Sequence, residues 1–411
     1  MSLFTVSKQP KFFEFVVLMA MIISMVALSI DAMLPALPDI ASDLGVTNIN
    51  DSQYVISILF AGMAIGQMIF GPMSDSIGRK NAINLGFVVF IIGCLVSLLA
   101  QTFMVMLIGR FLQGLGVAGP RIVSIALVRD RYEGRKMARV MSFVMTIFIL
   151  VPVVAPAVGQ AILIFSDWRG IFWMFLVLSF IALSWFNLRQ PETLPLESRV
   201  KFSIEQIVSD VKYIFAIPAA VGYTVAAGIV FGAFLGYLSS SQQIFQQQYG
   251  LGDQFVVYFG VLAASLGVAS LVNAKLVMRF GMRRLSLGAL MSITFLSVPF
   301  YFLSQHYAGN PPLVQVMAYL LAVFFFVGIL FGNLNALAME PLGSVAGIGA
   351  AVVGSLSTLI SVILGVVISS AYDGTILPLV SGFALLSIGC LVVMGWTEIM
   401  SARALKATTQ I

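Results

Sequence analysis

The chain has 411 residues, of which 60% are hydrophobic and only 9% carry a charged side chain, whereas soluble domains average about 25% charged residues. No soluble core can bury this much apolar surface. The formal net charge of +5 does not indicate a nucleic-acid partner, because the basic residues gather in short segments between long apolar runs. The composition therefore predicts a protein that spans a lipid bilayer.

Twelve apolar runs follow one another, and each is long enough to cross a hydrocarbon layer of about 30 Å as a helix. Helices are expected because lipid offers the backbone no hydrogen-bond partners. The first run is longer than the apolar region of a signal peptide and is expected to stay in the mature chain. The expected spans are 12–36, 52–71, 81–100, 103–128, 138–164, 169–187, 216–240, 255–278, 285–303, 313–339, 345–370 and 376–397.

Charge placement predicts the topology. With a cytoplasmic N-terminus, all but three of the 22 Lys and Arg residues fall in cytoplasmic segments, the exceptions being Arg110, Arg121 and Arg169. By the positive-inside rule, both termini are expected in the cytoplasm. The outer loops carry acids instead, namely Asp39, Asp43, Asp51, Asp167, Asp253 and Asp373.

The first expected span contains a carboxylate, Asp31, and the fourth contains a guanidinium, Arg110. A charge near the bilayer centre costs roughly 2.5–3.5 kcal/mol, so it is rarely kept without a use. Asp31 lies about seven residues before Pro38, and Arg110 about seven residues after Phe103. At 1.5 Å per residue, both are expected roughly 10 Å below the outer surface. They can face each other or share a water, which predicts proton exchange at Asp31 tuned by Arg110. The alternative is a structural ion pair.

Residues 71–80 (GPMSDSIGRK) form the strongest local pattern. Gly71 and the following proline are expected to end the second span, and Gly78 permits a tight turn. Asp75 can pair with Arg79 or with the N-terminus of a neighbouring helix.

The longest polar stretch, 188–212, divides the chain near its middle. We expect residues 1–190 to form an N-terminal six-helix bundle, 191–212 a cytoplasmic linker with a surface helix, and 213–411 a C-terminal six-helix bundle. The apolar face of the surface helix is expected to consist of Ile204, Ile207, Val208, Val211 and Phe215.

Two further patterns indicate no cofactor or metal. Residues 114–119 match G-x-G-x-x-G, but no strand precedes them, so dinucleotide binding is rejected. Cys94 and Cys390 lie in different spans without metal-binding spacing and are expected to pack as small apolar residues.

Several of these patterns resemble one family. Residues 71–80 resemble the signature of the major facilitator superfamily, and residues 109–116 (GRFLQGLG) resemble its fourth-span motif. Residues 151–159 (VPVVAPAVG), with Pro152, Pro156 and Gly159, resemble the antiporter motif of its drug exporters, although the leading Gly is missing and Gln160 stands where a second Gly is common. From the residues alone, the two prolines predict a kink. Matches at 31–38, 168–172 and 191–194 indicate the bicyclomycin-resistance (Bcr/CflA) subfamily of drug/proton antiporters.

The resemblance implies an all-α fold of twelve transmembrane helices in two six-helix pseudo-repeats. It implies a monomer in the bacterial inner membrane that exports small amphipathic drugs in exchange for protons, powered by the proton gradient and without a cofactor. It links the fourth-span arginine to proton coupling. It also makes the loop a cytoplasmic latch, with Gly71, Asp75, Gly78, Arg79 and Lys80 as members. Glu340, at the cytoplasmic end of the tenth span, is expected to make a gating contact near this loop.

The substrate is expected to be uncharged or zwitterionic, because Asp31 is the only confident acid at mid-depth. Arg121 is expected to snorkel, and Glu14 to sit at a span boundary. An alternative function is a proton-linked carrier of one specific metabolite, and another is an intramembrane enzyme or receptor, for which the sequence shows no catalytic cluster or ectodomain. Candidates for the substrate cleft, assigned by depth and span, are Tyr54, Ile58, Met145, Phe148, Tyr237, Phe331 and Asn335.

Overall fold

The computed structural model describes residues 10–409, so Lys8 and its neighbours in the expected cytoplasmic N-terminal segment lie outside it. Within the described range, the regular elements are helices and no strand occurs. Twelve of these helices, counted over the same range, are long and apolar enough to cross a membrane. The expected all-α class with twelve spans is therefore confirmed.

The chain divides into two compact units, residues 1–204 and 205–411, and each contains six of the candidate spans. The division falls inside the segment 191–212 that the sequence assigns to the linker. The two units share one local feature, a glycine turn after the second span. Gly78 has φ 95° and ψ 157°, and Gly281 has φ 78° and ψ 157°.

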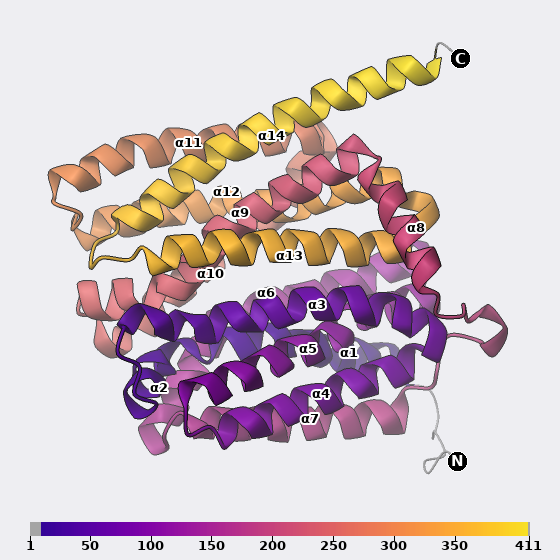
Figure 1. Cartoon of the computed structure of the whole chain (residues 1–411), viewed down its shortest axis with the longest axis horizontal. Coiled ribbons are helices and arrows are strands. Elements are labelled where there is room, and N and C mark those ends of the chain that lie inside the picture. The colour runs from indigo at the N-terminus through magenta and orange to yellow at the C-terminus, as the bar shows by residue number, and fades with distance from the viewer. Residues whose placement is uncertain (1–9, 410–411) are drawn as a thin grey trace. The chain divides into compact units, whose positions relative to one another are not determined.

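In the first unit, α5 lies against α3 and α4 (Figure 1). Glycines make this close approach possible, since a Cβ on Gly114 would lie 1.8 Å from the Leu59 carbonyl oxygen of α3. A Cβ on Gly116 would lie 2.3 Å from the Phe90 nitrogen of α4. The elements are α1 (Phe12–Asp31), η1 (Leu34–Ala36), α2 (Leu37–Asp43), η2 (Ile49–Gln53), α3 (Tyr54–Ile77), α4 (Arg79–Leu98), α5 (Phe103–Arg131), α6 (Gly134–Phe165), α7 (Arg169–Arg189) and η3 (Leu196–Ser198).

Two helix ends differ from the sequence prediction. The first helix stops at Asp31 rather than Ala36, because Pro35 has no N–H to donate to the Asp31 carbonyl. Conversely, α3 continues through Gly71 and Pro72 to Ile77, so the prediction that Gly71 ends this span is wrong. A proline inside a helix removes one backbone bond, whereas the positive φ of Gly78 takes the chain out of helical geometry.

In the second unit, α9 packs against α12, α13 and α14. The surface helix predicted in the second part of the polar stretch is present as α8, and its apolar residues Ile204, Val208 and Phe215 remain exposed, as a helix lying on a lipid surface requires. The elements are α8 (Ile204–Phe215), α9 (Pro218–Gln242), the π-helix η4 (Gln243–Gln248), η5 (Gly252–Gln254), α10 (Phe255–Phe280), α11 (Met282–His306), α12 (Leu313–Met339), η6 (Glu340–Val345), α13 (Ala346–Ser370) and α14 (Leu377–Thr409).

Candidate functional site

Asp31 is the last residue of α1 and lies within a span that continues through α2. Asp31 is only 4% exposed to solvent. No hydrogen bond or ion pair of its side chain occurs among residues 10–409. A buried charge is normally paired, so an unpaired carboxylate at this depth must lose its charge or meet water or a cation. This is the environment that proton exchange requires.

Arg110, on α5, is completely buried and makes three hydrogen bonds. Its Nε donates to the Val55 carbonyl of α3 at 2.9 Å. One terminal nitrogen donates to the Gln113 side-chain oxygen at 2.7 Å, and the other to the Ser29 carbonyl of α1 at 2.8 Å. The guanidinium therefore ties three elements of the first unit together, α1, α3 and α5.

The structural ion pair between Arg110 and Asp31 does not form within the described residues, and the end of α1 gives the reason. The helical donor for the Ser29 carbonyl would be the Met33 N–H, but that N–H donates to Ile30 instead. A helix end leaves such carbonyls without helical partners. Arg110 satisfies one of them, two residues before Asp31, and so contacts the backbone beside the carboxylate rather than the carboxylate itself.

The predicted kink motif lies in α6, which continues as one helix through Pro152 and Pro156. Gly159 lies against the break after α1, since a Cβ there would be 2.0 Å from the Ala32 carbonyl oxygen. Glycine is required at this position because the backbone of Ala32 occupies the side-chain space. The antiporter-like motif thus packs on the residue that follows Asp31.

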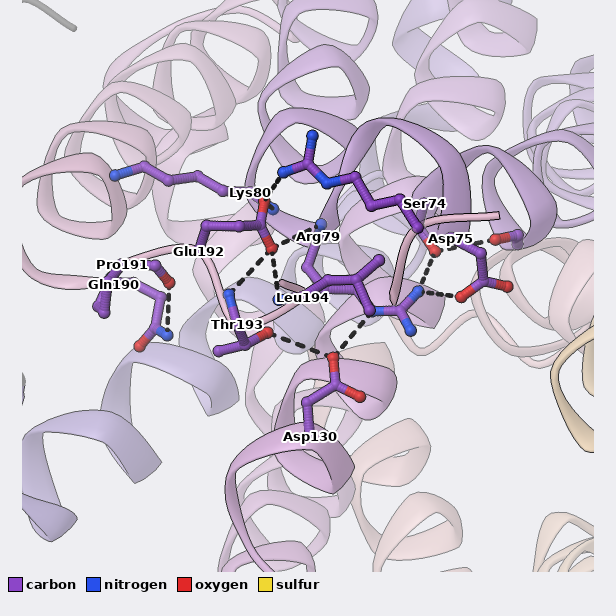
Figure 2. Close-up of polar contacts among 12 residues, drawn as sticks. Ser74, Asp75, Arg79, Lys80, Asp130, Gln190, Pro191, Glu192, Thr193 and Leu194 are labelled. Atoms are coloured by element: carbon purple, nitrogen blue, oxygen red, sulfur yellow. Dashed lines mark hydrogen bonds and ion pairs between the residues drawn. The ribbon is translucent and has the colours of Figure 1, made fainter. Parts of the chain in front are cut away.

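The loop 71–80 forms a polar cluster around Arg79 (Figure 2). Arg79 is only 5% exposed to solvent. The predicted pairing of Arg79 with Asp75 is confirmed. Arg79 also donates to Ser74 at 2.8 Å and, through Nε, to Asp130 near the end of α5 at 2.9 Å. Lys80 donates to the Asn187 carbonyl of α7 at 2.9 Å. The sequence analysis missed Asp130, which lies among basic residues and carries no pattern of its own.

Glu192, in the segment after α7, caps the first turn of α4 (Figure 2). Its carboxylate accepts the backbone N–H groups of Arg79 and Lys80, each at 3.0 Å, and those of Thr193 and Leu194. The first N–H groups of a helix have no partners within it and carry partial positive charge. A Cβ on Gly78 would lie 2.4 Å from Glu192, so this glycine supplies space as well as a positive φ.

Glu340 of the second unit forms an ion pair within its own unit. Its carboxylate lies 3.7 Å from Arg283, which follows the Gly281 turn and is also 3.5 Å from Glu398 of α14. Glu398 accepts a hydrogen bond from the Tyr223 hydroxyl. Arg283 holds a place in this unit similar to that of Arg79 in the first, and the sequence analysis missed both it and Glu398.

The predicted cleft residues differ in exposure. Tyr54, Ile58, Met145, Phe148 and Phe331 are partly exposed. Tyr237 is 1% exposed and packs on Phe259 and Phe324, so in this conformation it belongs to the core of its unit rather than to a surface open to substrate.

Asn335 is exposed, and its amide donates to the Phe331 carbonyl of the same helix. The buried asparagine of α12 is Asn333, which exchanges two hydrogen bonds with Asn273 of α10. The position along the span alone did not show which of the two asparagines is buried.

Two boundary charges are paired. Arg189 at the end of α7 donates to both carboxylate oxygens of Glu14, at 2.6 and 2.8 Å. Arg169, an exception to the positive-inside pattern, donates to Asp43 at 2.8 Å. No group of three or more His, Cys, Asp or Glu side chains that could hold a metal ion occurs in the part of the chain that the structure describes.

Comparison with known proteins agrees with this architecture. A solved peptide transporter, POT in complex with sulfate, superimposes with a TM-score of 0.75 over 97% of each chain at 12% identity. An uncharacterised MFS-type transporter of Bacillus subtilis, YdgK, is 30% identical over 352 residues, 84% of this chain and 86% of its own. A bicyclomycin resistance protein homolog of Haemophilus influenzae is 28% identical over 378 residues, covering 91% and 93% of the two chains.

The family model for the Major Facilitator Superfamily matches residues 18–366. This range includes Asp31, the loop 71–80, Arg110 and the antiporter-like motif of α6. Together with the twelve apolar helices in two six-span units, the match identifies an integral membrane transporter. The chain belongs to the major facilitator superfamily.

Proposed function

We propose that this protein is a proton-coupled antiporter, and not an enzyme, that exports small amphipathic drugs by alternating access. The proposal rests on one observation above all: a carboxylate buried at the end of α1 with no partner among residues 10–409, Asp31. Asp31 binds a proton on one side of the membrane and releases it on the other. The proton gradient supplies the energy, and the transporter uses no cofactor and works as a monomer.

Arg110 acts as a positioning residue in this mechanism. Its bond to the Ser29 carbonyl holds the last turn of α1, and Gly159 allows α6 to close on the residue after Asp31. The carboxylate therefore sits at a junction of α1, α5 and α6. A small shift of any of these helices changes the access of water to Asp31, and such a shift is how substrate binding on the same helices couples to proton release.

We place the protein in the inner membrane of a bacterium with both termini in the cytoplasm. The distribution of Lys and Arg supports this orientation. The drug class is supported by the similarity to the bicyclomycin resistance protein homolog and by the apolar and aromatic character of the partly exposed residues Tyr54, Met145 and Phe148, which adapt to many shapes.

Expression in a pump-deficient host tests the drug-export proposal. We expect protection against chemically unrelated amphiphiles, including phenicols, and weaker protection against quaternary ammonium dyes, because Asp31 is the only buried acid in the described spans and no second one is present to bind a permanent cation. The measurement is a panel of inhibitory concentrations, with the empty vector as the control. Protection confined to analogues of one metabolite would favour the dedicated-carrier alternative, and strong protection against permanent cations would contradict the expected substrate class.

The Asp75 loop is proposed to act as a conformational latch. The Asp75→Ala substitution removes one acceptor of Arg79 but leaves Asp130 in place, so the fold should persist while the cluster loosens. We expect slower turnover and accessibility shifted toward the inward-open state, with little change in substrate affinity. Transport rates in proteoliposomes, substrate Kd and cysteine-labelling rates measure these three effects.

Glu133→Ala is the matched control for the latch experiment, because Glu133 is an exposed acid in the turn between α5 and α6 and makes no capping hydrogen bond. It should behave like the wild type in all three measurements. A large loss of substrate affinity in Asp75→Ala, with unchanged labelling rates, would instead make the loop part of a binding site.

A further inference from the structure

A second arginine of α5 lies inside the span and has no role in the proposed coupling. Arg121 is ten residues before the end of the helix at Arg131, which is about 15 Å along the axis. It follows Arg110 by eleven residues, or about three turns, so the two side chains leave α5 on nearly the same face. That face is the one from which Arg110 reaches α1 and α3.

Arg121 does not snorkel to the cytoplasmic surface, contrary to the sequence expectation. Its guanidinium lies 3.6 Å from the sulfur of Met63 on α3. Met63 is fourteen residues before the end of α3 at Ile77, or about 21 Å. Helical side chains lean toward the N-terminus of their helix, and here this direction carries the charge toward mid-span rather than out of it.

The guanidinium of Arg121 lacks the partners that Arg110 has. Arg110 is fully buried and donates to three oxygens at 2.7–2.9 Å. Arg121 is only partly buried, and the Met63 sulfur is a weak acceptor for one of its five N–H donors. Within residues 10–409, no carboxylate lies within 4.0 Å of it. Keeping such a charge in a span costs roughly 2.5–3.5 kcal/mol on insertion scales.

We propose that Arg121 binds the carboxylate of the transported substrate, so that the pump prefers amphiphiles bearing a carboxylate, zwitterions included. A planar guanidinium with unused donors matches a carboxylate in a two-bond geometry, and the partial exposure of the side chain leaves it open to a ligand. The inference rests on the proposed drug export, and it refines the expected preference for uncharged compounds. Arg110 does not serve this role, because it is completely buried and three of its five N–H donors already reach protein oxygens.

The test compares an acid with its ester. Binding of dansylglycine and of dansylglycine methyl ester to the purified full-length protein is measured by fluorescence in detergent, without a proton gradient. The wild type should bind the acid at least tenfold more tightly than the ester. Arg121→Gln should lose this preference by weakening acid binding about tenfold while ester binding stays unchanged. Arg121→Lys keeps the charge but not the paired donors of the guanidinium, so it should bind the acid with intermediate affinity.

Arg135→Gln is the matched control, since Arg135 is an exposed cation at the start of α6 and should leave both affinities unchanged. Equal affinity of the wild type for acid and ester would overturn the proposal. An equal loss of affinity for the acid and for the ester, in Arg121→Gln or in Arg121→Lys, would also overturn it. Because binding is read without a gradient, a pump that binds acids but fails to exchange protons would contradict the proposed coupling and leave the role of Arg121 standing.

Discussion

Replacement of Asp31 by Asn should abolish proton-coupled export while leaving the protein folded. The amide is nearly the same size as the carboxylate, and it cannot exchange a proton in the physiological range. Because the Asp31 side chain has no hydrogen bond or ion pair to lose within the described residues, the folded state should not be weakened. Export driven by a proton gradient should fall to the level of empty vesicles.

Two measurements separate coupling from binding in the Asp31→Asn variant. Substrate-driven proton release from purified protein, followed with a pH indicator in weak buffer, should disappear. Substrate binding and elution as a single species should remain close to those of the wild type. Asp51→Asn is the matched control, because Asp51 lies in the short helix η2 and not in α1. Normal proton release by Asp31→Asn would remove this residue from the mechanism.

Replacement of Arg110 by Met should both abolish export and destabilise the first unit. The substitution leaves the carbonyls of Ser29 and Val55 and the amide oxygen of Gln113 without their donor. Val55 lies inside α3, so its carbonyl keeps a helical donor, and the Ser29 and Gln113 oxygens are left unsatisfied. Each unsatisfied buried acceptor costs about 1–3 kcal/mol, so a total loss of about 2 kcal/mol or more is expected. The last turn of α1 would lose its tie to α5, and Asp31 would lose its position.

Thermal unfolding in detergent measures this loss, and Arg121→Gln is a demanding control for it. Both substitutions remove an arginine from the same face of α5, but only Arg110 donates to protein oxygens. Arg110→Met should therefore unfold several degrees below the wild type, while Arg121→Gln should unfold close to it. Arg110→Lys should be intermediate in stability, because one ammonium cannot reach three acceptors. An unchanged unfolding temperature for Arg110→Met would show that the junction contributes nothing to stability.

The sequence by itself determined the all-α class and the twelve spans of this protein. Twelve apolar runs carry that information, because the cost of exposing a backbone to lipid is set by local composition. Arg79 was one of the two partners that the sequence offered for Asp75, since a separation of four residues keeps the two side chains within reach across the Gly78 turn. The α8 helix was also predictable, since its apolar residues recur at helical spacing.

Only the tertiary structure decided which partner each polar group meets. Arg110 bonds to the Ser29 carbonyl because α1 ends at Asp31 and leaves that oxygen without a helical donor, and Glu192 caps α4 from more than a hundred residues away. Arg121 points to Met63 rather than to the surface. Such partners are distant in sequence and are selected by how closely helices approach at glycines such as Gly114 and Gly159. Periodicity places a residue on a face and at a depth, but the packing of neighbouring backbones determines what that face contacts.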